Sequence, residues 1–389
     1  MLQLRLYLPL LLLLCLAPKT LYADDLEVVF LSPDNSRYWQ MVSGFMQAVA
    51  SDLDINLTVY TDQQKNRYSY RDLLGEALDK KRQPDFVMFM LKENVTAEML
   101  KRTEKAGVKT FTFNTNVPEF DGQTVGVPRQ YLKQWIGHLA PDNIAAGKQL
   151  AETLIAAARQ KPDTSPPEIL ALSGTRDSSA ATDRDKGLKE SVERDSATLN
   201  QLLYAGWSQS EAQDKTQLLL ERYPGTDVIW SASDGMALGA IQALESKGLK
   251  PGVDIMVGGV DWERRALDAI REGRLTASMG RHFMDGGVAL LLIHDFNAGY
   301  DFANEASGTT LSYDLKAANR ENLGVIEQVM QPDNWDSLDF TDFSRAHNPI
   351  LRSKDLSANE LMDTLMAELN TIGQRNRITE SGQDEEVKE

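Results

Sequence analysis

The chain has 389 residues, enough for two compact domains, and 57 Asp and Glu against 41 Lys and Arg give a formal net charge of −16. This acidic balance excludes the nucleic-acid-binding classes, which carry a basic footprint. Cys15 is the only cysteine and the four histidines lack the i, i+4 spacing of metal ligands, so we expect no disulfide, no metal site and no cofactor.

The first residues follow the pattern of a secretory leader. Arg5 precedes an apolar run over 8–16, and the small residue Ala23 is followed by two acidic residues. The run is too short to cross a membrane, which takes about 20 apolar residues. The pattern predicts a cleavable signal peptide over 1–23 and export to the periplasm. The alternatives are a buried N-terminal element, and lipidation at Cys15, which a large residue at the preceding position disfavours.

Short apolar runs alternate with amphipathic stretches in the first part of the mature chain. Such alternation is typical of βαβ units built on a parallel sheet. The predicted strands cover Leu26 to Leu31, Ile55 to Tyr60, Phe86 to Leu91 and Thr110 to Phe113. The predicted helices cover Tyr38 to Leu53, Arg71 to Lys80 and Thr96 to Ala106.

The same alternation restarts after residue 141, where Asp142 is placed to cap a helix that runs through Arg159. The next predicted strands cover Ile169 to Leu172, Leu202 to Ala205, Val228 to Ser231 and Ile255 to Gly258. The helices between them cover Ala180 to Asp195, Ser208 to Tyr223, Gly235 to Lys247 and Glu263 to Glu272. The chain is therefore predicted to be an α/β protein with two Rossmann-like, parallel-sheet lobes in series.

The pattern loses its regularity from about residue 319. We predict a C-terminal segment over 331–389 that includes an amphipathic helix from Ala358 to Ile372. Residues 375–389 are polar and rich in charge, which predicts a disordered acidic tail.

Polar and aromatic side chains follow the predicted strands. Parallel sheets bind ligands outside the carboxyl ends of their strands, so these side chains are the candidate ligand contacts. Aromatic rings stack on the apolar face of a sugar, while amide, guanidinium and carboxylate groups serve its hydroxyls. The predicted ligand-binding residues are Asp34, Ser36, Tyr38, Trp39, Asn114, Arg184, Trp207, Ser233, Asp234, Asp261 and Arg281.

Each of these residues also has an ordinary structural interpretation. Tyr38 and Trp39 are equally well explained as packing of their helix onto the sheet. Asn114 is also explained as a turn residue, and Arg184 as one partner of an exposed ion pair with a neighbouring aspartate. Their shared position at strand ends is what favours a binding site.

Four motifs resemble the signatures of the ribose-type periplasmic binding proteins. They are SDGMALGAI at 233–241, GGVD at 258–261, LDAIREG at 267–273, and PDN at 141–143 with Gly147. The resemblance covers roughly 26–311 and, within the family, is greatest to the LuxP group of receptors for a furanosyl borate signal. One position departs from that group, because Val260 stands where those receptors have tryptophan.

The resemblance implies three crossings between the lobes, near Ala140, Arg281 and Thr309. It divides the chain into lobe 1, at 24–139 with 283–308, and lobe 2, at 142–280 with 309–330. It also implies a monomer that closes on a sugar-like ligand and delivers it to the permease of an ABC importer. The alternative is a LuxP-like receptor that reports its ligand to a membrane sensor kinase or cyclase.

Two other classes of function are disfavoured by the sequence. An α/β hydrolase would carry a Gly-x-Ser-x-Gly elbow, and none is present, so we do not expect an enzyme. A sugar-responsive repressor of related fold would begin with a DNA-binding helix-turn-helix rather than with an export leader.

Overall fold

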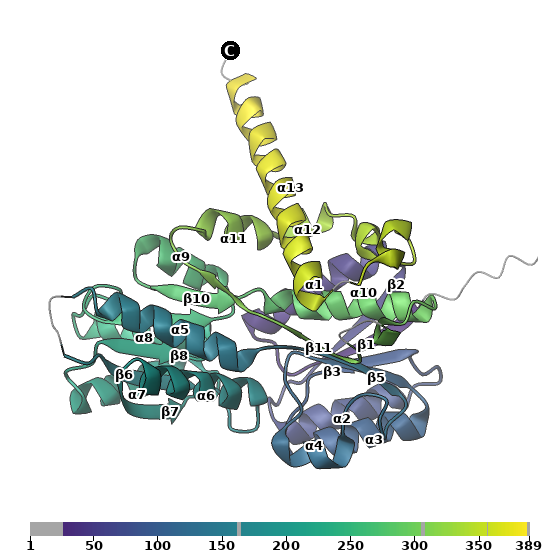
Figure 1. Ribbon diagram of the computed structural model, residues 1–389, viewed down its shortest axis with the longest axis horizontal. Coiled ribbons are helices and arrows are strands. Elements are labelled where there is room, and N and C mark those ends of the chain that lie inside the picture. The colour runs from purple at the N-terminus through teal and green to yellow at the C-terminus, as the bar shows by residue number, and fades with distance from the viewer. Residues whose placement is uncertain (1–25, 162–164, 305–307, 356, 387–389) are drawn as a thin grey trace, which may run out of the picture.

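A computed structural model describes residues 26–161, 165–304, 308–355 and 357–386, which form two α/β lobes and a C-terminal extension (Figure 1). The leader predicted over 1–23 lies outside the described residues. Each lobe is built on a six-stranded sheet, and helices cover both faces of each sheet. The predicted fold class is confirmed.

Lobe 1 contains a sheet of order β11-β5-β4-β3-β1-β2, parallel throughout. Its first five strands are β1 (Leu26–Ser32), β2 (Ile55–Thr61), β3 (Phe86–Phe89), β4 (Lys109–Phe113) and β5 (Trp135–Pro141). The helices between them are α1 (Arg37–Asp52), α2 (Arg67–Leu78), α3 (Thr96–Ala106) and α4 (Glu119–Val125). Helix α10 (Asp285–Asn297) packs against α1 and completes this lobe.

Lobe 2 contains a sheet of order β12-β10-β9-β8-β6-β7, in which only the short edge strand β12 is antiparallel among the described strands. Its strands are β6 (Glu168–Ser173), β7 (Thr198–Tyr204), β8 (Val228–Ser231), β9 (Met256–Val260), β10 (Ala277–Gly280) and β12 (Lys316–Ala318). Its helices are α5 (Asn143–Ala158), α6 (Ser179–Arg194), α7 (Gln209–Arg222), α8 (Asp234–Ser246) and α9 (Arg264–Glu272).

Helices α5 and α6 approach each other closely, and two glycines permit it. A Cβ atom at Gly147 would collide with the backbone of Arg184, and one at Gly187 would collide with the backbone of Ile144. The contact matters for the site because it brings Arg184 of α6 against Asn143, the first residue of α5.

The chain crosses between the lobes after β5, after β10 and after β11 (Thr310–Tyr313). The first two crossings agree with those predicted near Ala140 and Arg281. The third was predicted too early, at Thr309, with 309–330 assigned to lobe 2. Strand β11 instead pairs with β5 in lobe 1, so the crossing follows Tyr313. Four residues of alternating exposure gave too short a signal to place this strand from the sequence.

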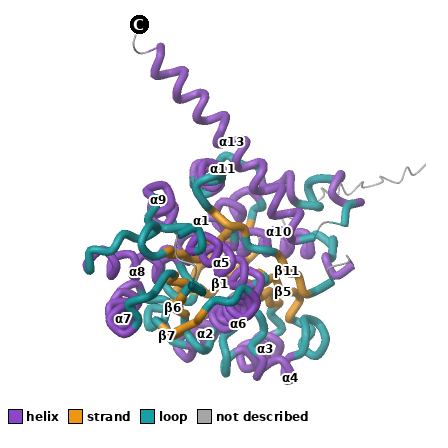
Figure 2. The backbone as a smooth tube through the Cα atoms, turned by 60° about the vertical axis from the view of Figure 1, so that its left-hand side comes forward, coloured by secondary structure: helices purple, strands orange, loops and turns teal. Residues whose placement is uncertain are grey.

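The C-terminal extension comprises residues 323–355 and 357–386. It contains α11 (Leu323–Val329), α12 (Pro332–Asp336), the 3-10 turns η3 (Phe340–Phe343) and η4 (Pro349–Ser353), and α13 (Ala358–Glu386). Helix α13 lies over the junction of the lobes and then projects away from the body, as both backbone views show (Figures 1 and 2).

The acidic tail predicted to be disordered from Arg375 is helical as far as Glu386. The first turns of α13 are anchored by the buried side chains of Met362, Leu365 and Leu369. Once a helix is nucleated in this way, adding further turns costs little, so the polar end continues the helix.

Candidate ligand-binding cleft between the lobes

Six polar side chains meet where the two lobes face each other. We call them the interlobe cluster: Tyr38, Asn114, Arg184, Asp261, His282 and Asp285. They come from the start of α1, the end of β4, α6, the end of β9, the turn after β10 and the start of α10. Four of them were predicted as ligand contacts; His282 and Asp285 were not.

The lobe 1 side of the cluster is centred on Asn114, which is 6 % exposed. Its amide donates to the Tyr38 hydroxyl at 2.6 Å and to Asp285 Oδ2 at 3.0 Å. Asp285 Oδ2 also accepts a hydrogen bond from Tyr313 at 3.0 Å. The backbone of Asn114 has φ 73°, a left-handed conformation that asparagine tolerates better than most residues. This conformation turns the chain at the strand end where the cluster lies.

The lobe 2 side is centred on Arg184, which is 3 % exposed. Its guanidinium donates to Asn143 Oδ1 at 2.8 Å and to the carbonyl of Ala232 at 2.7 Å. A third nitrogen lies 3.5 Å from His282 Nε2, and the same histidine nitrogen lies 3.3 Å from Asp261 Oδ1. The predicted pairing of Arg184 with Asp261 is therefore bridged by His282.

His282 joins the two halves of the cluster. Its ring lies against the ring of Tyr38, with the centroids 4.8 Å apart, and its carbonyl accepts a bond of 3.3 Å from the Tyr38 hydroxyl. Burial and the nearby Arg184 charge hold the pKa of His282 well below its usual value. The imidazole is therefore neutral at pH 7, so one ring nitrogen donates and the other accepts.

Burial dominates the charge state of the two cluster carboxyls. It raises the pKa of Asp261 to about 8, against the opposing effect of the Arg184 charge. It raises the pKa of Asp285 to about 7, although Asn114 and Tyr313 donate to that carboxylate. Both carboxyls therefore hold protons at neutral pH that an exposed aspartate would have released.

Three buried polar atoms in and beside the cluster have no hydrogen-bond partner in the structure: Asp285 Oδ1, His282 Nδ1 and Asn143 Nδ2. A buried polar atom without a partner costs about 1–3 kcal/mol. The cluster thus offers acceptors and donors to a small polar molecule that could meet several of them at once.

The lobes also touch directly at the rim of the cleft. Asn116 donates to Asp183 at 2.9 Å, and Ser179 donates to the carbonyl of Asn116 at 3.0 Å. Ion pairs of 3.5 Å between Arg67 and Asp177, and of 3.6 Å between Arg37 and Glu263, add to these contacts. The structure is therefore that of the closed arrangement of the lobes.

Several predicted contacts have structural roles close to the strand ends. Trp39 is 7 % exposed and packs in the core of lobe 1 against Phe30 and Phe113. Asp34 accepts a hydrogen bond from the backbone N–H of Ser36 at 2.7 Å, which shapes the turn before α1. The Trp39 ring also meets the ring of Tyr38 edge-on, with the centroids 5.1 Å apart, so it supports a member of the interlobe cluster from the core side.

The predicted pair Ser233 and Asp234 caps α8 and supports the loop that carries Asp261. Ser233 Oγ accepts from the N–H of Met236, and Asp234 accepts from Ser278 Oγ at 2.8 Å and from the N–H of Glu263 at 2.9 Å. Asp234 is fully buried, and its bond to Glu263 holds the loop that carries Asp261.

Trp207 follows the edge strand β7 and lies apart from the described contacts of the cluster. Its ring covers Gly174, where an added Cβ would collide with it, and its Nε1 donates to Thr175 at 3.3 Å. It remains a predicted contact whose ring is half-buried beside the strand ends.

Arg281 was predicted to reach into the cleft from the hinge, and the structure corrects this. Its side chain is fully buried and points to the C-terminal extension, where it donates to Asn359 and, at 2.5 Å, to Asp363 of α13. The physical reason is charge: α13 places a carboxylate and an amide oxygen over the hinge, and a buried guanidinium needs such partners.

The sequence contained weak signals for the two cluster residues that were not predicted. His282 is one of the four histidines, whose spacing indicates no metal site, and Asp285 lies in a run for which the sequence predicts no helix. Among the described residues no group of three or more His, Cys, Asp or Glu could hold a metal ion. None of the helices in the described ranges is long and apolar enough to cross a membrane.

Comparisons of the sequence and of the structure both match this chain to known binding proteins. The family model described as "Periplasmic binding protein domain" matches residues 27–284. The fructose import binding protein FruE of Bifidobacterium longum (strain NCC 2705) is 25 % identical over 269 residues, which are 69 % of this chain and 76 % of FruE. The galactofuranose-binding protein YtfQ of Escherichia coli (strain K12) is 29 % identical over 145 residues, 36 % of this chain and 43 % of YtfQ.

A solved periplasmic sugar-binding protein from Pseudomonas fluorescens superposes with a TM-score of 0.76 at 29 % identity. That match covers 88 % of this chain and 99 % of the solved one, so it includes more than the matched domain.

Proposed function

This chain belongs to the periplasmic binding protein family, and from that premise we propose that it captures a sugar or sugar-like ligand in the periplasm for an ABC importer. The observation that carries the proposal is the interlobe cluster. Its members come from both lobes. Two of its buried atoms have no partner, Asp285 Oδ1 and His282 Nδ1, and each of them donates or accepts a hydrogen bond according to whether it carries the proton. A polyol supplies hydroxyls that donate and accept, so it suits such a site.

We assign the ligand contacts to the cluster. Arg184 and Asp261 supply donors and an acceptor from lobe 2, and Asn114 supplies its amide from lobe 1. The Tyr38 ring offers the flat apolar surface that sugar faces prefer. Closure excludes water, so each ligand hydroxyl must find its partner among these groups.

The leader predicted over 1–23 delivers the chain to the periplasm, where it acts as a monomer and hands its ligand to a membrane permease. The chain is a binding protein and not an enzyme; the names of its relatives FruE and YtfQ, which describe binding, support this. Pure protein incubated with the sugar it binds should return the sugar unchanged.

A thermal-shift screen of the chain from residue 24 onward tests the proposal. The panel contains D-ribose, D-fructose, D-galactose, L-arabinose, myo-inositol, sugar acids and boric acid with diols. A ligand that binds only the folded state raises the melting temperature, and we expect this for at least one neutral sugar. If no compound of the panel shifts the melting temperature, sugar capture is rejected.

Calorimetry with the sugar that the screen identifies then tests the site. Asp261→Ala should weaken binding at least tenfold, which corresponds to about 1.4 kcal/mol. Asp268→Ala is the matched control, because that carboxylate is exposed on α9. Equal effects of both variants would remove Asp261 from the site.

The same screen addresses the alternative of a LuxP-like signalling receptor. A response to boric acid with a diol, and not to sugars alone, would favour the signal receptor. Val260, at the position where the LuxP group has tryptophan, instead supports a sugar.

A further inference from the structure

We propose that the first turns of α13 clamp the hinge and hold the lobes in the closed arrangement, so that the C-terminal extension sets how much of the unliganded protein is closed. This regulation rests on the sugar capture proposed above. The clamp consists of Asn359 and Asp363 on α13 and of the two crossing segments that they bind, at Arg281 and at 314–316.

The clamp ties two of the three crossings to each other. Arg281, in the crossing after β10, donates to the carbonyl of Asp314 in the crossing after β11 at 2.6 Å. Asn359 Oδ1 accepts from both crossings, from the Arg281 guanidinium and from the N–H of Asp314 at 2.9 Å. Asp363 binds Arg281 and lies 3.7 Å from Lys316 Nζ. One turn of helix therefore fixes the relative position of both segments.

The hinge residue itself is held in an uncommon conformation. Arg281 has φ 86°, which a residue other than glycine rarely adopts, and its side chain is fully buried. Such a conformation persists only where surrounding contacts hold it, and the guanidinium bonds to Asp314 and to α13 are among those contacts. Hinge bending changes the backbone angles of a few such residues, so the clamp acts at the point where bending occurs.

The extension is attached to lobe 2 on one side of the hinge. Helix α11 packs against α9, and Glu327 of α11 forms an ion pair with Arg271 of α9. Arg320, in the chain leading to α11, donates to the carbonyl of Ile270 at 3.3 Å. These contacts fix the start of the extension to the lobe that carries Arg184 and Asp261.

The extension is attached to lobe 1 on the other side. Trp335 of α12 stacks on Phe283, with centroids 5.4 Å apart, and meets Phe45 of α1 edge-on at 5.5 Å. The N–H of Phe340 donates to Asp52, the last residue of α1, at 2.8 Å. The extension thus bridges both lobes and the hinge between them.

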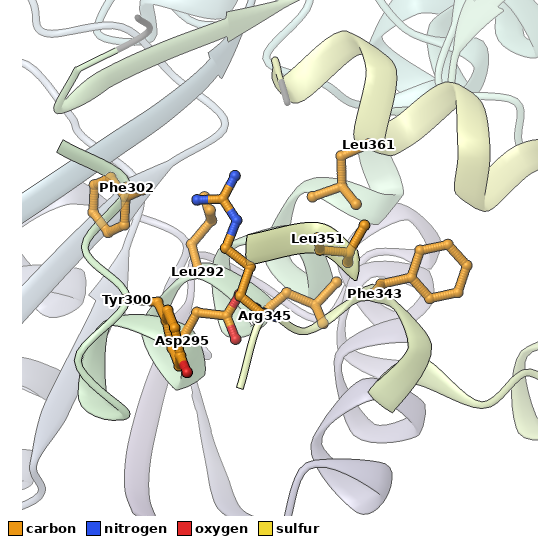
Figure 3. A pocket seen from close by; sticks show the side chains of 9 residues that line it. Leu292, Asp295, Tyr300, Phe302, Phe343, Arg345, Leu351 and Leu361 are labelled. Atoms are coloured by element: carbon orange, nitrogen blue, oxygen red, sulfur yellow. Dashed lines mark hydrogen bonds between the residues drawn. The ribbon is translucent and has the colours of Figure 1, made fainter. Parts of the chain in front are cut away.

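Helix α13 is also packed against α10, close to the clamp. Side chains of the extension and of lobe 1 converge there around a small cavity of about 30 Å³, shown in Figure 3. Leu361 of α13 and Leu351 of η4 face Leu292 of α10 across it. The cavity has room for about one water molecule, so this contact is nearly close-packed and holds α13 in place.

The direction of the effect follows from the state in which these contacts occur. The lobes meet at the rim of the cleft while α13 binds both crossings, so the clamp contacts belong to the closed arrangement. A contact made only in one state shifts the equilibrium toward that state. Loss of the clamp should therefore favour the open arrangement, and a smaller closed fraction weakens apparent affinity in proportion.

The test measures the separation of the lobes without any sugar. The chain from residue 24 onward contains no cysteine, so Tyr131→Cys in lobe 1 and Leu218→Cys in lobe 2, both well exposed, accept a pair of spin labels. Distances are recorded by pulsed electron resonance in the labelled parent, in the clamp variant Asn359→Ala/Asp363→Asn, and in Glu368→Gln. The last is the control, an exposed acidic residue of the same helix.

We expect the ratio of open to closed molecules to rise about tenfold in the clamp variant and to stay unchanged in Glu368→Gln. An unchanged distance distribution in a folded clamp variant overturns the proposal, as does an equal shift in the control. If the double variant does not fold, Asp363→Asn alone, which keeps the side-chain size, gives the same readout. If distances shift but no sugar of the panel binds, the clamp stands and sugar capture fails; the reverse result rejects only the clamp.

Discussion

At the scale of single residues, the buried carboxyl of Asp285 makes stability depend on pH. Its pKa is about 7 in the folded protein and about 3.9 in an unfolded chain, so the folded state binds the proton more tightly. The carboxyl therefore destabilises the fold progressively as pH rises from about 4 to about 7.

The substitution Asp285→Asn should remove this dependence. Relative to the parent, the variant should gain about 3 kcal/mol between pH 4.5 and pH 8, measured by urea unfolding at both values. The exposed carboxylate of Asp214 on α7 provides the control variant Asp214→Asn. Parallel pH profiles of parent and Asp285→Asn would contradict the assignment.

Two adjacent aromatic residues should separate binding from stability. Tyr38 lies in the interlobe cluster through its hydroxyl, whereas Trp39 lies in the core of lobe 1. We expect Tyr38→Phe to weaken binding of the identified sugar about five- to tenfold and to lower the unfolding free energy by only about 1 kcal/mol, through the lost hydrogen bonds of its hydroxyl. Trp39→Ala should instead cost about 3–5 kcal/mol of stability. Calorimetry and urea unfolding of both variants check this, and the opposite pattern would return Trp39 to the binding site.

The position of residues at the ends of parallel strands could be predicted from sequence. Asn114, Arg184 and Asp261 lie at strand ends or beside them, and the structure brings all three into the interlobe cluster; that they contact a ligand stays a prediction. Arg281 follows the same rule in sequence, but its side chain turns to α13. No local pattern could show this, because Asn359 and Asp363 are distant in the chain.

At the scale of elements, the aromatic contact between α12 and α1 should carry much of the attachment of the extension. Trp335 is 5 % exposed and packs on Phe45 and Phe283. Trp335→Ala should lower the free energy of unfolding by about 3–5 kcal/mol. Val325→Ala, at an exposed position on α11, should change it by less than about 0.5 kcal/mol. Urea unfolding of both variants measures these free energies. A loss of stability of similar size in both variants would show that the aromatic contact contributes little.

Long apolar runs were predicted better than short elements. Strands β1 and β3 are largely buried on both faces of a parallel sheet, so their sequences are mostly apolar and easily recognised. Strand β11 has four residues that alternate between exposed and buried, and β12 has three residues that run from exposed to buried. Their partners, β5 and β10, decide their structure, so sequence alone assigned β11 to the wrong lobe.

At the scale of the whole molecule, the two lobes differ in how they are assembled from the chain. Lobe 2 takes five of its six described strands from one continuous stretch, β6 to β10, and lacks only the antiparallel edge strand β12. Lobe 1 is discontinuous: α10 and β11 join it from beyond lobe 2.

This connectivity implies an order of folding. When residue 280 has been synthesised, lobe 2 can close its core, while lobe 1 still exposes the edge of β5 that β11 later covers. Contacts between distant parts of a chain form late, because their loop closure is costly. In refolding followed by pulsed hydrogen exchange, amides of β8 and β9 should gain protection before those of β5 that pair with β11. Simultaneous protection would mean that the lobes fold as one cooperative unit. The lobe that begins the chain is therefore the lobe completed last, so its unpaired edge at β5 stays accessible to other molecules for longest.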